Sequence, residues 1–101
     1  MKDKQEKFSN IINYLVDTIE KKSIFKNESS YTYKLINQDL ERIAQKFGEE
    51  AIEVVIAAGS DKKKELINET ADLLYHLLIL LKKRNITLDE IADELTNRKE
   101  K

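Results

Sequence analysis

Several residue types are absent or rare in this sequence of 101 residues, which has no cysteine, no proline, no tryptophan and only two glycines. Without cysteine there is no disulfide, no cysteine-based zinc site and no thiol chemistry. Without proline, and with so little glycine, few residues interrupt helices, so the many Leu, Ile, Glu and Lys residues predict an all-α fold. The length predicts a single domain over residues 1–101.

A strong net charge and a long apolar run are also missing. The formal net charge is −1, so we expect no nucleic-acid partner. The first residues, MKDKQEKF, lack an apolar signal region, and no stretch of 18 apolar residues could cross a membrane. A cytoplasmic protein with no membrane partner is therefore expected.

Apolar spacing predicts helices over residues 4–21, 31–58, 61–84 and 88–98, with a connector over 22–30. Glu50 lies at the edge of an apolar stripe on the second helix, whereas Ile52 and Ile56 point to another side. A helix that is apolar on two sides packs against two partners, and small chains gain core by association. We therefore predict a four-helix bundle that is completed by dimerisation.

The predicted fourth helix carries its own start signal. Thr87 and Glu90 form the T-x-x-E pattern of a capping box. Behind this cap, Leu88, Ile91 and Leu95 give the helix one apolar face for docking on the bundle.

Acidic residues form two short motifs on the two middle helices. E-E-x-x-E covers residues 49–53 and E-x-x-D covers residues 69–72. Residues three apart share a helix face, and a short turn makes the two helices antiparallel, so the acidic pairs lie at similar heights. Converging carboxylates in a partly dry groove need a cation, and hard oxygen ligands favour Mg²⁺, with Mn²⁺ as a substitute. The predicted ligands are Glu50, Glu53, Glu69 and Asp72.

Each of these features also has a structural interpretation. Acidic motifs on helices are common as solvated faces. The run Lys62–Lys64 is either an exposed turn or a phosphate contact. Lys46 either pairs with Glu49 and Glu50 or reaches a phosphate. His76, the single histidine, is either a core residue or a neighbour that supports Asp72. A di-iron bundle is excluded because no E-x-x-H motif is present.

Three longer strings carry a family resemblance: SYTYKL (30–35), IAQKFGEEAIEVVIAA (43–58) and ETADLLYHLLILL (69–81). The E-E-x-x-E and E-x-x-D pattern resembles the all-α nucleotide pyrophosphohydrolases of MazG type. The three strings together resemble, within that superfamily, the phosphoribosyl-ATP pyrophosphohydrolases of histidine biosynthesis. The resemblance covers about residues 28–98.

The resemblance implies Mg²⁺-dependent hydrolysis of phosphoribosyl-ATP to phosphoribosyl-AMP and pyrophosphate. It implies the same four metal ligands, with Glu49 as the carboxylate that positions or deprotonates the water. The implied substrate and phosphate contacts are Ser30, Tyr31, Thr32, Lys34 and Lys46. Ser29 departs from the family, which frequently has glycine there. A fused cyclohydrolase partner would need zinc-binding cysteines, so we expect this chain to carry the pyrophosphohydrolase alone.

Two other functions remain open from the sequence. A housekeeping pyrophosphohydrolase acting on dUTP or other nucleoside triphosphates would share the metal site and differ around residues 30–35. A non-catalytic helical dimerisation module would carry the acidic motifs only for solubility.

Overall fold

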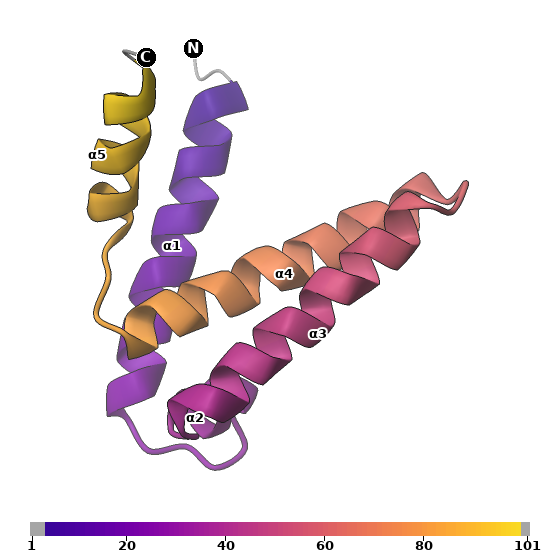
Figure 1. The fold of residues 1–101 in the computed structure, drawn as a ribbon. Helices are drawn as coiled ribbons and strands as arrows, with labels where there is room; N and C mark the ends of the chain where they lie inside the picture. Colours follow the sequence, from indigo (N-terminus) through magenta and orange to yellow (C-terminus); the bar gives the residue numbers. More distant parts are fainter. Residues whose placement is uncertain (1–3, 100–101) are drawn as a thin grey trace.

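The structure, a computed structural model, describes residues 4–99, and these form helices joined by short connections with no strand (Figure 1). The all-α prediction is confirmed, but the predicted number of four helices is wrong. The described residues form five helices: α1 (Lys4–Ile24), α2 (Tyr31–Ile36), α3 (Leu40–Ala58), α4 (Lys63–Lys83) and α5 (Leu88–Lys99).

The additional helix arises because the predicted helix over 31–58 is interrupted between Ile36 and Leu40. Asn37 ends α2, and its side-chain amide donates to the Tyr33 carbonyl at 2.9 Å. Asp39 starts α3, where its carboxylate accepts from the Arg42 amide at 2.9 Å. Short Asn and Asp side chains compete with the helix for backbone groups, and here they stop one helix and start the next.

α3 and α4 form an antiparallel hairpin, and they pack against each other more extensively than any other pair of helices (Figure 1). Gly59 ends α3 with its amide donating to the Ile56 carbonyl at 3.1 Å. In the turn, the Ser60 hydroxyl donates to the Ala57 carbonyl and accepts from the Lys62 amide. The short turn thus fixes the register between the two helices, as the sequence predicted.

α1 and α2 pack on the C-terminal half of α4, where the apolar core lies. The buried core residues are Ile19, Leu35, Ile36, Ile43, Leu78 and Ile79. At the edge of this core, Lys82 of α4 forms an ion pair with Glu20 of α1. The Lys83 amino group donates to the Ile36 carbonyl at 3.1 Å, which satisfies a backbone acceptor at the end of α2.

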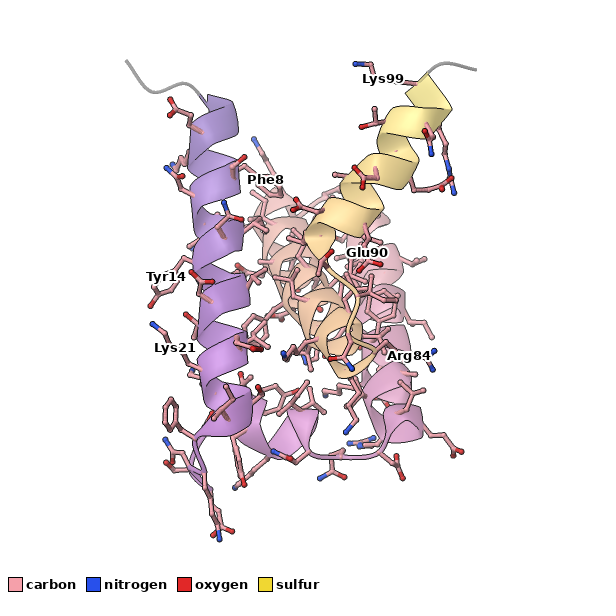
Figure 2. All side chains as sticks on the ribbon, turned by 90° about the vertical axis from the view of Figure 1, so that its left-hand side faces the viewer. Phe8, Tyr14, Lys21, Arg84, Glu90 and Lys99 are labelled. Atoms are coloured by element: carbon pink, nitrogen blue, oxygen red, sulfur yellow. The ribbon has the colours of Figure 1, made fainter. Side chains whose placement is uncertain are left out.

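α5 meets the core only at its first residue, Leu88. Every residue from Asp89 to Lys99 is exposed, so the predicted docking of Ile91 and Leu95 is wrong for a single chain. Other apolar side chains are exposed too, and Tyr14 of α1 projects away from the remaining helices (Figure 2). None of the described helices is both long enough and apolar enough to cross a membrane.

The capping box at the start of α5 is confirmed. The Thr87 amide donates to Glu90 Oε1 at 2.8 Å, and the Glu90 amide donates back to the Thr87 hydroxyl at 3.2 Å. These hydrogen bonds from the Thr87 backbone and side chain lower the pKa of Glu90. The cap therefore holds a helix that has few other contacts.

Replacing Thr87 with alanine removes the hydroxyl that caps α5. We expect the first-turn amides of α5 to exchange with solvent about fivefold faster, because losing such a cap costs about 1 kcal/mol. Hydrogen exchange followed by NMR measures this. Thr96→Ala is the matched control, since the Thr96 hydroxyl bonds only the Ala92 carbonyl within the same helix. Equal protection of the first turn in both variants would contradict the capping role.

The same cap should depend on pH. Because the folded pKa of Glu90 is lowered, its stabilisation is fully present above the ordinary glutamate pKa and is lost as the pH falls through the lowered value. Acidification should therefore speed exchange in the first turn of α5 in the unmodified chain, relative to the intrinsic rate, and have little such effect in Thr87→Ala.

Candidate metal and substrate site

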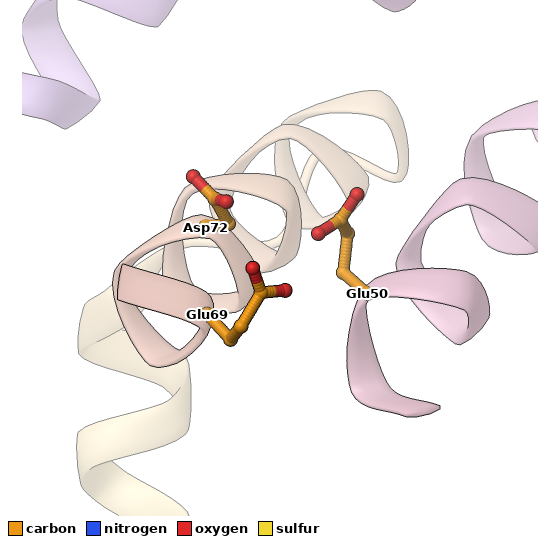
Figure 3. A group of neighbouring side chains, drawn as sticks. All are labelled: Glu50, Glu69 and Asp72. Carbon is orange, nitrogen blue, oxygen red and sulfur yellow. The ribbon is translucent and has the colours of Figure 1, made fainter. Parts of the chain in front are cut away.

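Three carboxylates from the α3–α4 hairpin converge on one point. Glu50 projects from α3 toward Glu69 and Asp72 of α4 (Figure 3). One oxygen atom from each of the three side chains lies within 4.8 Å of the other two. The matched heights that the sequence predicted for the two acidic motifs are thus present in the structure.

Glu50 reaches this point because of its place on α3. It stands seven residues after Ile43 and seven before Ala57, and both of these are buried. Seven residues make nearly two helical turns, so Glu50 lies in line with the buried side of α3. The sequence placed Glu50 at the edge of an apolar stripe, whereas the structure places it on the side that packs against α4.

The charges of this cluster are poorly balanced. The pKa of Glu69 is raised, first by desolvation and then by the negative charges of Glu53, Asp72 and Glu50. Among the described residues, the positive group that pairs with this cluster is Lys46, whose amino group lies 3.6 Å from Glu50 Oε1. One lysine does not neutralise this many carboxylates, so the cluster favours the approach of a cation.

The donor set fits a hard divalent cation. All three converging groups are carboxylates, and oxygen ligands of this kind suit Mg²⁺ or Mn²⁺ rather than softer metals. Glu50 and Glu69 are half-buried while Asp72 is exposed, so the cluster opens to solvent on one side. An ion held there by these residues would also be accessible to a phosphate group.

The two other glutamates of the first motif lie outside the three-residue cluster. Glu53 is exposed, and its charge is the largest charge effect on the pKa of Glu69. Glu49 is exposed as well. Its carboxylate accepts from the Gln45 side chain at 3.3 Å and lies 4.0 Å from Lys46. The structure therefore brings together three of the four predicted ligands and leaves Glu53 at the margin.

The segment that the resemblance assigned to the substrate divides into buried and open positions. Ser30 caps α2 by accepting from the Tyr33 amide at 3.2 Å. Thr32 is only 2% exposed and shares a hydrogen bond with Tyr75 of α4, so it supports the fold and does not line an open surface. Lys34 is exposed and forms no ion pair with any described residue.

Tyr31 is half-exposed and lies near the acidic cluster. The pKa of its hydroxyl is raised, chiefly by desolvation, with Lys46 lowering it and Glu50 raising it. The Tyr31 hydroxyl is 2.7 Å from His76 Nε2. The structure therefore links the segment over 30–34 with the hairpin that carries the carboxylates.

His76 is buried, and its ring contacts Asp72 through the backbone. His76 Nδ1 is 2.7 Å from the Asp72 carbonyl oxygen, and no hydrogen bond joins the ring to the Asp72 carboxylate. His76 was predicted to support Asp72, and the contact that it makes is with the Asp72 backbone carbonyl. The pairing of His76 with Tyr31 was not predicted, because 45 residues separate them and nothing local marks the contact. Tyr75 was also missed, although it precedes His76 in the DLLYH string.

A separate cavity of about 340 Å³ lies between α1, the end of α4 and the start of α5. Its apolar wall includes Ile19, Leu78 and Ile86, and none of the clustered carboxylates lines it. The carboxylate cluster is therefore a feature of the open face of the hairpin and not of this cavity.

Comparison with known proteins places this geometry in a family. Residues 12–99 match the family profile of phosphoribosyl-ATP pyrophosphohydrolase. Phosphoribosyl-ATP pyrophosphatase 1 of Bradyrhizobium diazoefficiens is 48% identical over 87 residues, which cover 86% of this chain and 82% of the relative. The phosphoribosyl-ATP pyrophosphatase of Methanosarcina acetivorans is 43% identical over 93 residues, covering 90% and 89%.

Longer relatives match as well. The histidine biosynthesis bifunctional protein HisIE of Caldanaerobacter subterraneus subsp. tengcongensis is 45% identical over 91 residues, which cover 90% of this chain and 44% of the relative. The chain thus spans about half the length of the bifunctional relatives that it matches. The match over 12–99 and the identities of more than 40% agree with the motifs on α2, α3 and α4, and the chain belongs to the phosphoribosyl-ATP pyrophosphohydrolase family.

Proposed function

We propose that this chain hydrolyses phosphoribosyl-ATP to phosphoribosyl-AMP and pyrophosphate in histidine biosynthesis, with Mg²⁺ as the metal. The observation that carries the proposal is the convergence of Glu50, Glu69 and Asp72 in a chain of this family. Glu53 adds negative charge at the margin of the cluster and is the fourth carboxylate that we assign to metal binding.

Hydrolysis of a phosphoanhydride needs charge neutralisation and a positioned water more than it needs a protein nucleophile. Glu50, Glu69 and Asp72 would hold Mg²⁺, which when bound would neutralise phosphate charge and polarise the phosphate. Water adds to the α-phosphorus, and the bond to pyrophosphate breaks. Glu49, which is exposed beside Glu50, is the carboxylate that we assign to hold this water and accept its proton.

Two lysines are the residues that we assign to phosphate binding. Lys46 lies near both Glu50 and Tyr31, because its amino group is 3.6 Å from Glu50 Oε1 and its charge lowers the pKa of the Tyr31 hydroxyl. With a cation bound by Glu50, the Lys46 amino group would be available to bind a phosphate oxygen. Lys34 is exposed on α2 and is available for a second phosphate contact.

Pyrophosphate release from phosphoribosyl-ATP, ATP and dUTP tests the substrate. We expect rapid, Mg²⁺-dependent release from phosphoribosyl-ATP only, and none with a chelator. Glu50→Gln should lower turnover by about a hundredfold or more, because it removes a charged ligand at the reacting phosphate. Glu41→Gln is the matched control, since Glu41 is exposed in the first turn of the same helix. Release from ATP and dUTP alone would support the housekeeping enzyme instead.

Metal binding should also appear in thermal stability. Mg²⁺ at about ten times its dissociation constant stabilises a one-site protein by about 1.4 kcal/mol, which corresponds to a rise of roughly 6–11 °C in Tm for a domain of this size. Differential scanning calorimetry measures the rise. A non-catalytic dimerisation module would show no such rise.

Glu69→Gln sharpens the stability test, because it removes a carboxylate whose pKa is raised by burial and by like charges. We expect its Tm without metal to exceed that of the unmodified chain at neutral pH, and its rise with Mg²⁺ to be lost. Glu65→Gln, one turn earlier on α4, is the matched control and should keep the rise. A normal rise in Glu69→Gln would remove Glu69 from the metal site.

We propose that the partner of this chain is a second copy of itself. The two copies would pack through the outer face of α3, which we define as Ala44, Gly48, Ile52 and Val55. Ile52 and Val55 are 61% and 71% exposed. A Cβ built on Gly48 meets nothing within 4 Å, so nothing within the described chain requires glycine there. Glycine inside a helix costs about 1 kcal/mol relative to alanine. Close packing of a neighbouring helix against Gly48 would offset this cost.

Sedimentation equilibrium tests this dimer. We expect twice the chain mass of 11.8 kDa for the unmodified protein and the single-chain mass for Val55→Asp, because a buried unpaired charge opposes association. Gly48→Ala should stabilise α3 within one chain and yet weaken the dimer. A Val55→Asp protein that remains dimeric would show that the chains associate elsewhere.

A further inference from the structure

α2 is held on α4 by three side-chain contacts. Tyr31 bonds His76, Thr32 bonds Tyr75, and the Lys83 amino group bonds the Ile36 carbonyl. α2 has only six residues, and so short a helix is not stable by itself in water. Its position relative to the α3–α4 hairpin is therefore set by these contacts and by the burial of Leu35 and Ile36.

The Tyr31–His76 contact differs from the other two because one of its partners is open to solvent. Thr32 is buried, and the Lys83 contact is partly buried, but Tyr31 is half-exposed beside the carboxylate cluster. The two rings meet edge to face, with centroids 5.8 Å apart. His76 therefore contacts a half-exposed side chain that lies close enough to Glu50 for the charge of Glu50 to raise the pKa of the Tyr31 hydroxyl.

The direction of the hydrogen bonds follows from their chemistry. The Asp72 carbonyl oxygen can only accept, so His76 Nδ1 carries the hydrogen and donates to it. In the neutral ring Nε2 is then an acceptor, and the Tyr31 hydroxyl donates. No donor among residues 4–99 bonds the Tyr31 oxygen, and the His76 ring is tied to the backbone of Asp72, one of the clustered carboxylate residues.

We propose that His76 is a positioning residue for substrate binding, which acts by fixing the orientation of Tyr31 beside the carboxylate cluster. The inference rests on the proposed function, because it concerns how the substrate meets the same site. Without His76 the Tyr31 ring turns freely about its side-chain bonds, and binding must then immobilise it. Immobilising one such side chain weakens binding by about two- to tenfold. The effect falls on KM, since neither ring touches the reacting phosphorus.

Tyr31→Phe, His76→Phe and the double variant test the inference through KM and kcat for phosphoribosyl-ATP with saturating Mg²⁺. We expect KM to rise about fivefold in each single variant, with kcat changed less than twofold. The double variant should be no worse than either single one, because all three lack the same hydrogen bond. Tyr33→Phe is the matched control, since the Tyr33 hydroxyl forms no hydrogen bond with the described residues.

Thermal stability separates positioning from a purely structural role. Tyr31→Phe leaves the buried His76 Nε2 without a donor and should lower Tm, whereas the double variant removes both partners and should regain most of it. If the contact only stabilises the fold, KM returns with Tm in the double variant, and the inference is overturned. His76→Gln keeps an amide oxygen that can accept from Tyr31, so its KM should lie near that of the unmodified chain.

Three other outcomes of these measurements would overturn the positioning role. A raised KM in Tyr31→Phe with an unchanged KM in His76→Phe would mean that the Tyr31 hydroxyl acts directly on substrate, and it would overturn the positioning role. Unchanged KM in all variants would do the same while leaving the proposed function intact. Absence of turnover in the unmodified chain would overturn the proposed function and this inference with it.

Discussion

The antiparallel pairing of α3 with α4 is the constraint on which the fold and the candidate site both depend. The short turn after Gly59 fixes how far each residue of α3 lies from each residue of α4. That register brings Glu50 opposite Glu69 and Asp72. It also divides α4 into two parts, because its buried residues begin at His76, one turn after Asp72. α1 and α2 cover the C-terminal part, and the N-terminal part is left open for the carboxylates.

The clustered carboxylates destabilise the pairing of α3 with α4. Desolvation and neighbouring negative charge make the ionised form of Glu69 less favourable, and they raise its pKa for the same reason. Glu50 stands on the packed side of α3, between Ile43 and Ala57, where an apolar residue would stabilise the hairpin better. The apolar contacts on either side hold Glu50 in place despite this cost. A fold that keeps an acidic group there is suited to binding a cation.

Helical periodicity and the counting of residues from the turn were enough to predict the hairpin and three clustered carboxylates. They failed at residues 37–39 because Ile36, Leu40 and Ile43 keep helical spacing across the break. The helix is interrupted there by the side-chain hydrogen bonds of Asn37 and Asp39 to nearby backbone groups. They also gave no sign of the contact between Thr32 and Tyr75. These residues are 43 positions apart and meet only after α2 has packed on α4, and no local pattern in the sequence encodes that packing.

The break in the predicted helix also matters for function. An unbroken helix over residues 31–58 would rise 1.5 Å per residue and place Tyr31 about 28 Å from Glu50 along its axis. A single nucleotide could then hardly contact both residues. The structure instead ends α2 at Ile36 and turns the chain, so that Tyr31 bonds His76 and experiences the charges of Lys46 and Glu50. Asn37 and Asp39, whose side chains bond the Tyr33 carbonyl and the Arg42 amide, thereby allow α2, α3 and α4 to come together around the candidate site.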